Sequence, residues 1–336
     1  MDSRKIMALG KSSLVISLPK EWLRSNNLNR GDTVSMNIQP DLSLIVHPSS
    51  QTRAKNQYIS ISVKPDETKE SIIRQIIGCY LNGYDTITLQ SKTIFNEEQQ
   101  TAIREVVKSL YLRIIESAAS KVVMQTLMDE SMASVSSGIE RMHIITNSMC
   151  QDVLNAMKQG NRDLAKSVVH LEDDVDSFMY LLVRLIRSSA VNPTLAQQLG
   201  VNLVDCLDYQ TLVHRIEYVA DHLTLIANSL INLFEREMSK ESFPVLIEAA
   251  EIAFSAYDRA VLAFQSMSVE HSNEIIDVQE EVERLEECIM PLPYYGEREE
   301  KNVLSYICVI RDSIKRISEY SADIAELTID RVYKLS

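Results

Sequence analysis

The sequence predicts a multidomain α+β protein with a small N-terminal β domain, a spacer of alternating strands and helices, and two tandem three-helix bundles. Three observations favour this fold class. Short β-branched and alternating apolar runs fill the first 130 residues, and apolar residues recur at spacings of three and four after them. Gly and Pro number only eight each in 336 residues. Because these two residues are the strongest helix breakers, their scarcity favours long helices.

The first domain is expected over residues 1–48. Its predicted strands and one short helix are Leu14–Leu18, Thr33–Ile38, Leu42–Val46 and the helix Pro19–Ser25. A unit of this size buries too little surface to be stable alone, so we expect it to dimerise.

The spacer is expected over residues 55–128. Its predicted order is strand 58–63, helix 68–82, strand 85–90, helix 97–112 and strand 121–128. This β-α-β-α-β pattern is typical of a small spacer or docking domain, and its residues suggest no chemistry.

The two bundles are expected over residues 130–238 and 240–336. The breakers that divide this part into six long helices are Gly160, 193–200, Pro244, the polar stretch 266–273 and 291–296. A weak repeat supports the division: residues 169–178 align with 276–285, and residues 216–227 align with 314–325.

Charge is distributed unevenly along the chain. Residues 1–48 carry six Lys/Arg and four Asp/Glu, whereas residues 129–336 carry eighteen and thirty-five. A mildly basic head and a strongly acidic body indicate two different partners, an anion such as DNA for the head and basic surfaces or cations for the body.

Composition also excludes several classes of protein. No apolar run reaches the roughly 20 residues of a membrane span, and the N-terminus lacks the apolar core of a signal peptide, so we expect a cytoplasmic protein. Five scattered cysteines without a Cys-x-x-Cys pair argue against a disulfide framework or a thiolate zinc site. No phosphate loop, nucleophile elbow or His-Asp-Ser set occurs, and we expect no enzyme activity.

Two segments of the head carry a family resemblance. Gly-Lys-Ser-Ser-Leu-Val-Ile-Ser-Leu-Pro-Lys-Glu-Trp (10–22) and Leu-Asn-Arg-Gly-Asp-Thr-Val (28–34) resemble the AbrB/SpoVT swapped-hairpin family. The resemblance implies two chains interlaced into one small β-barrel that presents cations to DNA. On it, the candidate DNA contacts are Arg4, Lys5, Lys11, Lys20 and Arg24. The alternative is a head that only dimerises the protein.

Carboxylate pairs interrupt the apolar periodicity of the first bundle. Glu172 and Asp176 lie four apart on one helix, and Glu217 and Asp221 lie four apart on the next, so each pair shares a helical face. Two carboxylates about 4 Å apart repel by about 4 kcal/mol at an effective dielectric of 20. Four together need a cation, protons or water, and an all-oxygen set suits Mg²⁺ or Mn²⁺ and tolerates iron. A plain acidic surface is the alternative.

The sequence around these pairs resembles the PhoU family of phosphate-uptake regulators. Leu-Glu-Asp-Asp-Val-Asp (171–176) and Arg-Ile-Glu-Tyr-Val-Ala-Asp-His (215–222) are similar to its Glu/Asp-x-x-x-Asp motifs. The order of head, spacer and double bundle is similar to that of an archaeal PhoU-family member with an AbrB/SpoVT-like head. The resemblance implies a metal ion at Glu172, Asp176, Glu217 and Asp221.

The second bundle departs from this pattern. Gln279 with Glu283 and Lys315 with Glu319 stand at the repeat-equivalent positions, so a neutral amide and a cation replace two carboxylates. We expect no second metal site there.

Three functions remain after this reading. The first is a homodimeric regulator of phosphate uptake that binds operator DNA. The second is an accessory protein that docks on a phosphate transporter or sensor kinase and uses its head only to dimerise. The third, a di-iron oxidoreductase, rests on a single Glu-x-x-His at Glu140 and His143, where such sites need two.

Overall fold

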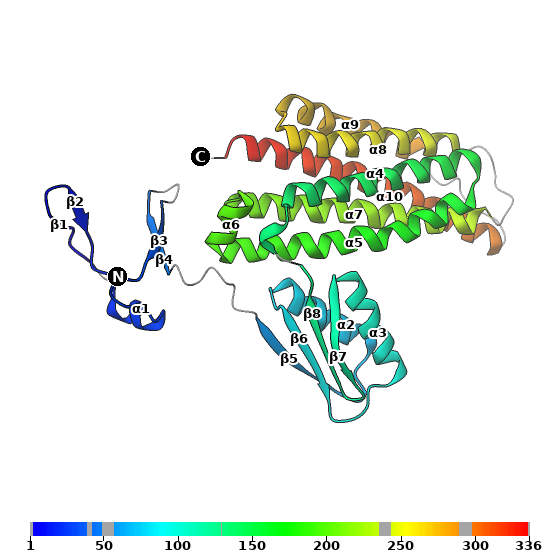
Figure 1. Cartoon of the computed structure of the whole chain (residues 1–336). Coiled ribbons are helices and arrows are strands. Elements are labelled where there is room, and N and C mark those ends of the chain that lie inside the picture. Colours follow the sequence, from blue (N-terminus) through cyan, green and yellow to red (C-terminus); the bar gives the residue numbers. More distant parts are fainter. Residues whose placement is uncertain are drawn as a thin grey trace. The chain divides into compact units, whose positions relative to one another are not determined.

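The computed structural model describes residues 3–38, 42–48, 57–128, 130–234, 243–288 and 298–334 (Figure 1). It divides the chain into two compact units, residues 1–56 and 57–335. The predicted boundaries between domains fall in the gaps between the described ranges. The predicted fold class is confirmed: a small β-rich N-terminal part precedes a mostly helical body.

The described part of the first unit contains two small antiparallel hairpins and one short helix. These elements are β1 Met7–Leu9, β2 Ser13–Val15, α1 Lys20–Ser25, β3 Val34–Ile38 and β4 Leu44–Pro48. Strand β1 pairs with β2, and β3 pairs with β4, so the sheets of one chain do not close into a barrel. In place of the predicted strand Leu14–Leu18 the structure has β2, Ser13–Val15, and β1 was not predicted. Gly10 at φ 72° lies in the turn between β1 and β2.

The spacer, residues 57–128, folds around one mixed sheet, and we call it the α/β domain. Its elements are β5 Tyr58–Val63, α2 Lys69–Leu81, β6 Thr86–Ser91, α3 Glu97–Ser109, β7 Leu112–Ala118 and β8 Lys121–Thr126. The strand order is β5-β6-β8-β7, with β5 parallel to β6 and the other pairs antiparallel. Tyr80, Ile87 and Met124 are fully buried in its core.

Strand β7 is an addition to the predicted β-α-β-α-β order. The helix predicted to reach residue 112 ends at Ser109, Leu110 is its C-cap, and Tyr111 follows at φ 52°. This left-handed residue reverses the chain into an edge strand that pairs with β8.

In the described residues of the body there are six long α-helices and one short one. They are α4 Val135–Gln159, α5 Arg162–Val191, α6 Pro193–Leu199, α7 Leu203–Leu233, α8 Phe243–Ser266, α9 Val269–Cys288 and α10 Arg298–Val332. Helices α4, α5 and α7 pack together, as do α8, α9 and α10, and one hydrophobic core runs through both sets. Figure 1 shows the long helices running side by side.

Two of the predicted breaks contain helix. Helix α6, Pro193–Leu199, lies within the predicted break 193–200, because Asn192 caps it and Pro193 suits its first turn, and Gly200 ends it. Helix α9 starts at Val269, inside the polar stretch 266–273, whose side chains bond to the preceding turn rather than to solvent alone. The predicted break at 291–296 lies outside the described residues.

Close packing in the body depends on Gly138 of α4. A Cβ atom at this position would lie 2.5 Å from Cδ2 of Leu182, a contact that no real side chain makes. Gly138 therefore lets α4 approach α5.

The start of α7 is fixed by the last turn of α10. Asp205, which completes the capping box of α7 with Asn202, accepts a hydrogen bond from Lys334 and lies 3.9 Å from Nη2 of Arg331. The guanidinium of Arg331 lies over two rings, 4.5 Å from the centroid of Tyr209 and 4.6 Å from that of Phe264. No helix in the described part of the chain is long and apolar enough to cross a membrane.

Candidate functional site: a carboxylate cluster on the first bundle

The candidate site lies where α5 packs against α7. Asn161 caps α5 by accepting hydrogen bonds from the backbone N–H groups of Asp163 and Leu164, and the capping box described above starts α7. These caps fix where each helix begins. With the buried Val175 and Ile216 facing the core, the helices then place their carboxylates along the seam.

The four predicted carboxylates form one electrostatic cluster, and we call them the carboxylate cluster. Glu172 and Asp176 come from α5, Glu217 and Asp221 come from α7, and all four are half-buried. Burial, followed by the charges of the neighbouring carboxylates, raises the pKa of Asp176 to about 7 and that of Glu217 to about 8. Burial also raises the pKa of Glu172 and of Asp221. The surroundings of the cluster thus disfavour its charged form, and Asp176 and Glu217 keep their protons to a higher pH than free carboxyl groups do.

The oxygen chemistry and excess charge of the cluster fit a hard cation. In the positions described, however, no group of three or more His, Cys, Asp or Glu side chains converges closely enough to hold a metal ion. The metal site at Glu172, Asp176, Glu217 and Asp221 therefore stays a prediction. When bound, such an ion would supply the positive charge that these residues lack.

In the presence of a chelator, the unit 57–335 should lose stability as the pH rises from about 5 to about 8. The pKa values of Asp176 and Glu217, about 7 and about 8, exceed the ordinary 3.8 and 4.5. The folded protein therefore binds extra protons in this window, and releasing them costs free energy of folding. Since both groups keep partial contact with solvent, we expect a loss of about 2 kcal/mol rather than the full value of the shifts.

Urea denaturation at pH 5, 6.5 and 8 would measure this loss. The double variant Asp176→Asn, Glu217→Gln keeps the shape of the site and should show a nearly flat profile. A wild type as flat as this variant would contradict the raised pKa values.

The corresponding positions of the second bundle are engaged with local partners. Gln279 donates to Oε1 of Glu283 at 3.3 Å, and Nη1 of Arg316 lies 2.6 Å from Oε2 of Glu319. The absence of a metal from the second bundle stays a prediction.

The five cations predicted to contact DNA are all exposed. Arg4 and Lys5 precede β1, Lys11 lies in the β1–β2 turn, and Lys20 and Arg24 lie on α1. A hydrogen bond of 2.6 Å from the backbone N–H of Asn29 to Oδ2 of Asp32 fixes the turn that follows α1. DNA contact by these side chains stays a prediction.

Of the pair Glu140 and His143, only His143 has a structural role, which the sequence did not reveal. His143 is nearly buried, and its Nε2 lies 3.0 Å from Oδ1 of Asp258 on α8. Asn147 donates to the same oxygen at 3.1 Å. Because Glu140 is exposed, the two residues do not share a site, and His143 joins the two bundles.

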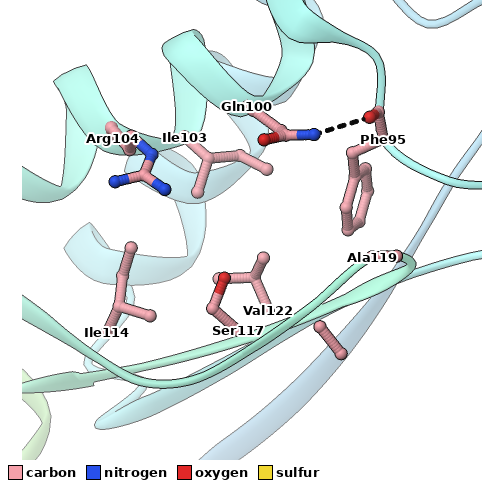
Figure 2. Close-up of a pocket in the computed structure, with 9 residues that line it drawn as sticks. Phe95, Gln100, Ile103, Arg104, Ile114, Ser117, Ala119 and Val122 are labelled. Atoms are coloured by element: carbon pink, nitrogen blue, oxygen red, sulfur yellow. Dashed lines mark hydrogen bonds between the residues drawn. The ribbon is translucent and has the colours of Figure 1, made fainter.

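A hollow lies in the α/β domain, between α3 and the β7–β8 hairpin (Figure 2). It encloses about 250 Å³, and Figure 2 shows Arg104, Gln100 and Ser117 around it. Its floor is closed by Phe95, Ile103 and Val122, which are 1–5% exposed. A ligand would find little apolar surface to cover there, so the carboxylate cluster remains the candidate site.

Comparison with known protein families identifies two segments of the chain. Residues 139–230 match the PhoU domain, and residues 7–54 match the antidote-toxin recognition domain of the bacterial antitoxin MazE. The chain therefore carries a PhoU domain, which includes all four carboxylates, behind a MazE/AbrB-like head. A search of curated proteins found no match.

One solved structure supports the fold of the body, and a second shows a weaker likeness. The crystal structure of PhoU from Pseudomonas aeruginosa is 18% identical, with a TM-score of 0.52 over 59% of this chain and 95% of the other. The phosphate transport system regulatory protein PhoU from Streptococcus pneumoniae is 14% identical, with a TM-score of 0.49 over 59% and 93%.

Proposed function

We propose that this chain, with a PhoU domain behind a MazE/AbrB-like head, is a cytoplasmic, homodimeric regulator of phosphate uptake. The head binds operator DNA, and the carboxylate cluster binds a divalent or trivalent cation, Mg²⁺, Mn²⁺ or iron. The body regulates through binding rather than catalysis. The observation that carries the proposal is the PhoU match over residues 139–230, which supports regulation of phosphate uptake.

Dimerisation is supported by the apolar surface of the head. Its two hairpins leave nine large apolar side chains at least half exposed. These residues are Ile6, Met7, Leu9, Leu14, Ile16, Met36, Ile38, Leu42 and Leu44. Because a soluble monomer rarely exposes so dense an apolar set, a second copy of the head is the partner we propose.

Replacing two of these side chains with carboxylates should dissociate the dimer. The variant Leu14→Asp, Ile38→Asp places charge on side chains that are 73% and 75% exposed in one chain, so it needs no repacking within the chain. We expect a monomer in sedimentation equilibrium, whereas Leu262→Asp, at an apolar position 48% exposed on the body, should leave the dimer intact. An undiminished dimer in the head variant would move the interface elsewhere.

Binding to DNA should be tight at low salt and should weaken steeply as salt is added. A dimer would bring ten cations to the phosphates, and each neutralised phosphate adds about 0.9 to the slope of log K against log salt. The variant Lys11→Ala, Arg24→Ala removes four cations from the dimer and should reduce the slope by about 3 to 4. Fluorescence anisotropy on labelled genomic fragments would measure it.

A matched control removes two exposed cations outside the head, Lys92→Ala with Lys108→Ala, and should leave the slope unchanged. If the full chain fails to bind DNA at low salt, the second function gains support: an accessory protein that docks on a phosphate transporter or sensor kinase. The acidic body, with eighteen Lys/Arg against thirty-five Asp/Glu, favours a basic partner surface for that docking.

A further inference from the structure

One face of α5 joins the carboxylate cluster to the α/β domain. Glu172, Asp176, Tyr180 and Arg184 follow one another at steps of four residues, so they form a row that winds about 40° around the helix at each step. Each step advances about 6 Å along the axis. The cluster and Arg184 are therefore only about 12 Å apart on a continuous helix.

Arg184, the last residue of this row, connects α5 to the α/β domain. Its side chain is 1% exposed, and all of its described bonds are short. Nη1 donates to the carbonyl oxygens of Tyr80 at 2.7 Å and Tyr84 at 2.9 Å, and Nη2 donates to Oδ1 of Asp85 at 2.8 Å. Nε donates to Oε1 of Glu130 at 2.7 Å. Because the guanidinium bonds to several partners at once, α5 and the segment 80–85 are held rigidly together.

Tyr180 occupies the position between the cluster and Arg184. It packs against the hydrophobic core of the bundles and also against the core of the α/β domain. Burial and then the charges of Asp176 and Glu217 raise its pKa to about 12, because its phenol faces the cluster. No described residue bonds its hydroxyl group, so the ring acts through packing.

We propose that a change of charge at the carboxylate cluster alters the conformation of the α/β domain, and that Tyr180 and Arg184 transmit this change. The inference rests on the proposed function, because the cation proposed to bind the cluster would neutralise its carboxylates. Ionised carboxylates on α5 and α7 repel, and neutralising them lets the helices approach at Asp176 and Glu217. A close-packed helix does not absorb such a shift locally, so Tyr180 and Arg184 carry it to the segment 80–85.

Hydrogen–deuterium exchange on the full chain tests the coupling at residues 80–86, between the end of α2 and the start of β6. The first arm compares the wild type in EDTA with the wild type in Mn²⁺. The second arm needs no metal and uses Asp176→Asn with Glu217→Gln in EDTA. Because relief of repulsion tightens the junction, we expect amide exchange in 80–86 to slow at least fivefold in both arms.

Variants at Tyr180 separate transmission from binding. Tyr180→Ala removes the ring and should reduce the exchange response to less than twofold, whereas Tyr180→Phe should keep it. The control Arg187→Gln removes an exposed contact at the same junction, a hydrogen bond of 2.8 Å to Oδ1 of Asn82, and should keep the response as well.

Calorimetric titration with Mn²⁺ distinguishes the two failures. If Mn²⁺ does not bind but the neutralised variant still slows exchange, the cation part of the proposed function is wrong and the coupling stands. If Mn²⁺ binds and neither arm changes exchange in 80–86, the coupling is overturned. A full response in folded Tyr180→Ala would overturn the role of Tyr180.

Discussion

Replacing Arg184 with methionine should lower the free energy of unfolding of the unit 57–335 by about 3 kcal/mol. The methionine fills much of the volume but leaves Asp85 and Glu130 without their cation and two backbone carbonyl groups without a donor. Removing one partner of a buried ion pair typically costs about 3 to 5 kcal/mol. The side chains of Asp85 and Glu130 are 24% and 22% exposed, which places the expected loss at the lower end.

The control for this prediction is Arg187→Met, one turn further along α5. Arg187 donates to Asn82, but the contact is exposed, so the loss should stay below about 0.5 kcal/mol. Urea denaturation followed by circular dichroism would compare the two variants. Equal losses would show that Arg184 does no more than a surface arginine.

Mn²⁺ should stabilise the wild type and should lose this effect in Asp176→Asn with Asp221→Asn. At a free ion concentration 100-fold above Kd, binding to the folded state alone adds about 2.7 kcal/mol. The two substitutions keep the shape of the side chains but remove two of four charges from the cluster, which are the charges that hold a hard cation. Thermal unfolding with and without Mn²⁺ would measure the effect, and elemental analysis would count the ions.

The matched control lies in the second bundle. Glu283→Gln with Glu319→Gln removes the same charge from positions engaged with Gln279 and Arg316, so the Mn²⁺ effect should remain. Equal metal content in the wild type and in Asp176→Asn, Asp221→Asn would exclude the carboxylate cluster as the site.

The long helices could be predicted because particular residue types mark where they begin and end. Gly160 adopts φ 64° after α4, and Asn161 caps α5, as the pattern of breakers predicts. Strand β7 could not be predicted in the same way. Apolar spacing continues from Val106 past Leu110, and the left-handed residue that ends the helix is Tyr111 rather than glycine.

The carboxylate pairs were visible in the sequence because both partners of each pair lie on one helix, four residues apart. The environment of Arg184 was not. A charge within Leu-Leu-Val-Arg-Leu-Ile (181–186) signals that buried partners exist, but Asp85 and Glu130 lie 99 and 54 residues away in the chain. A local pattern cannot pair residues at such separations, so the joint between α5 and the α/β domain had to come from the structure.

The contact between the last turn of α10 and the first turn of α7 affects how the body is made on the ribosome. Helix α7 is synthesised early, yet Arg331 and Lys334, which hold Asp205 of its capping box, are added after all the other helices. Until they leave the exit tunnel, Asp205 lacks both cations, and the rings of Tyr209 and Phe264 lack the guanidinium that lies over them. The first turn of α7 therefore gains these contacts only when the end of the second bundle has been made, so the two bundles depend on each other for this part of their packing.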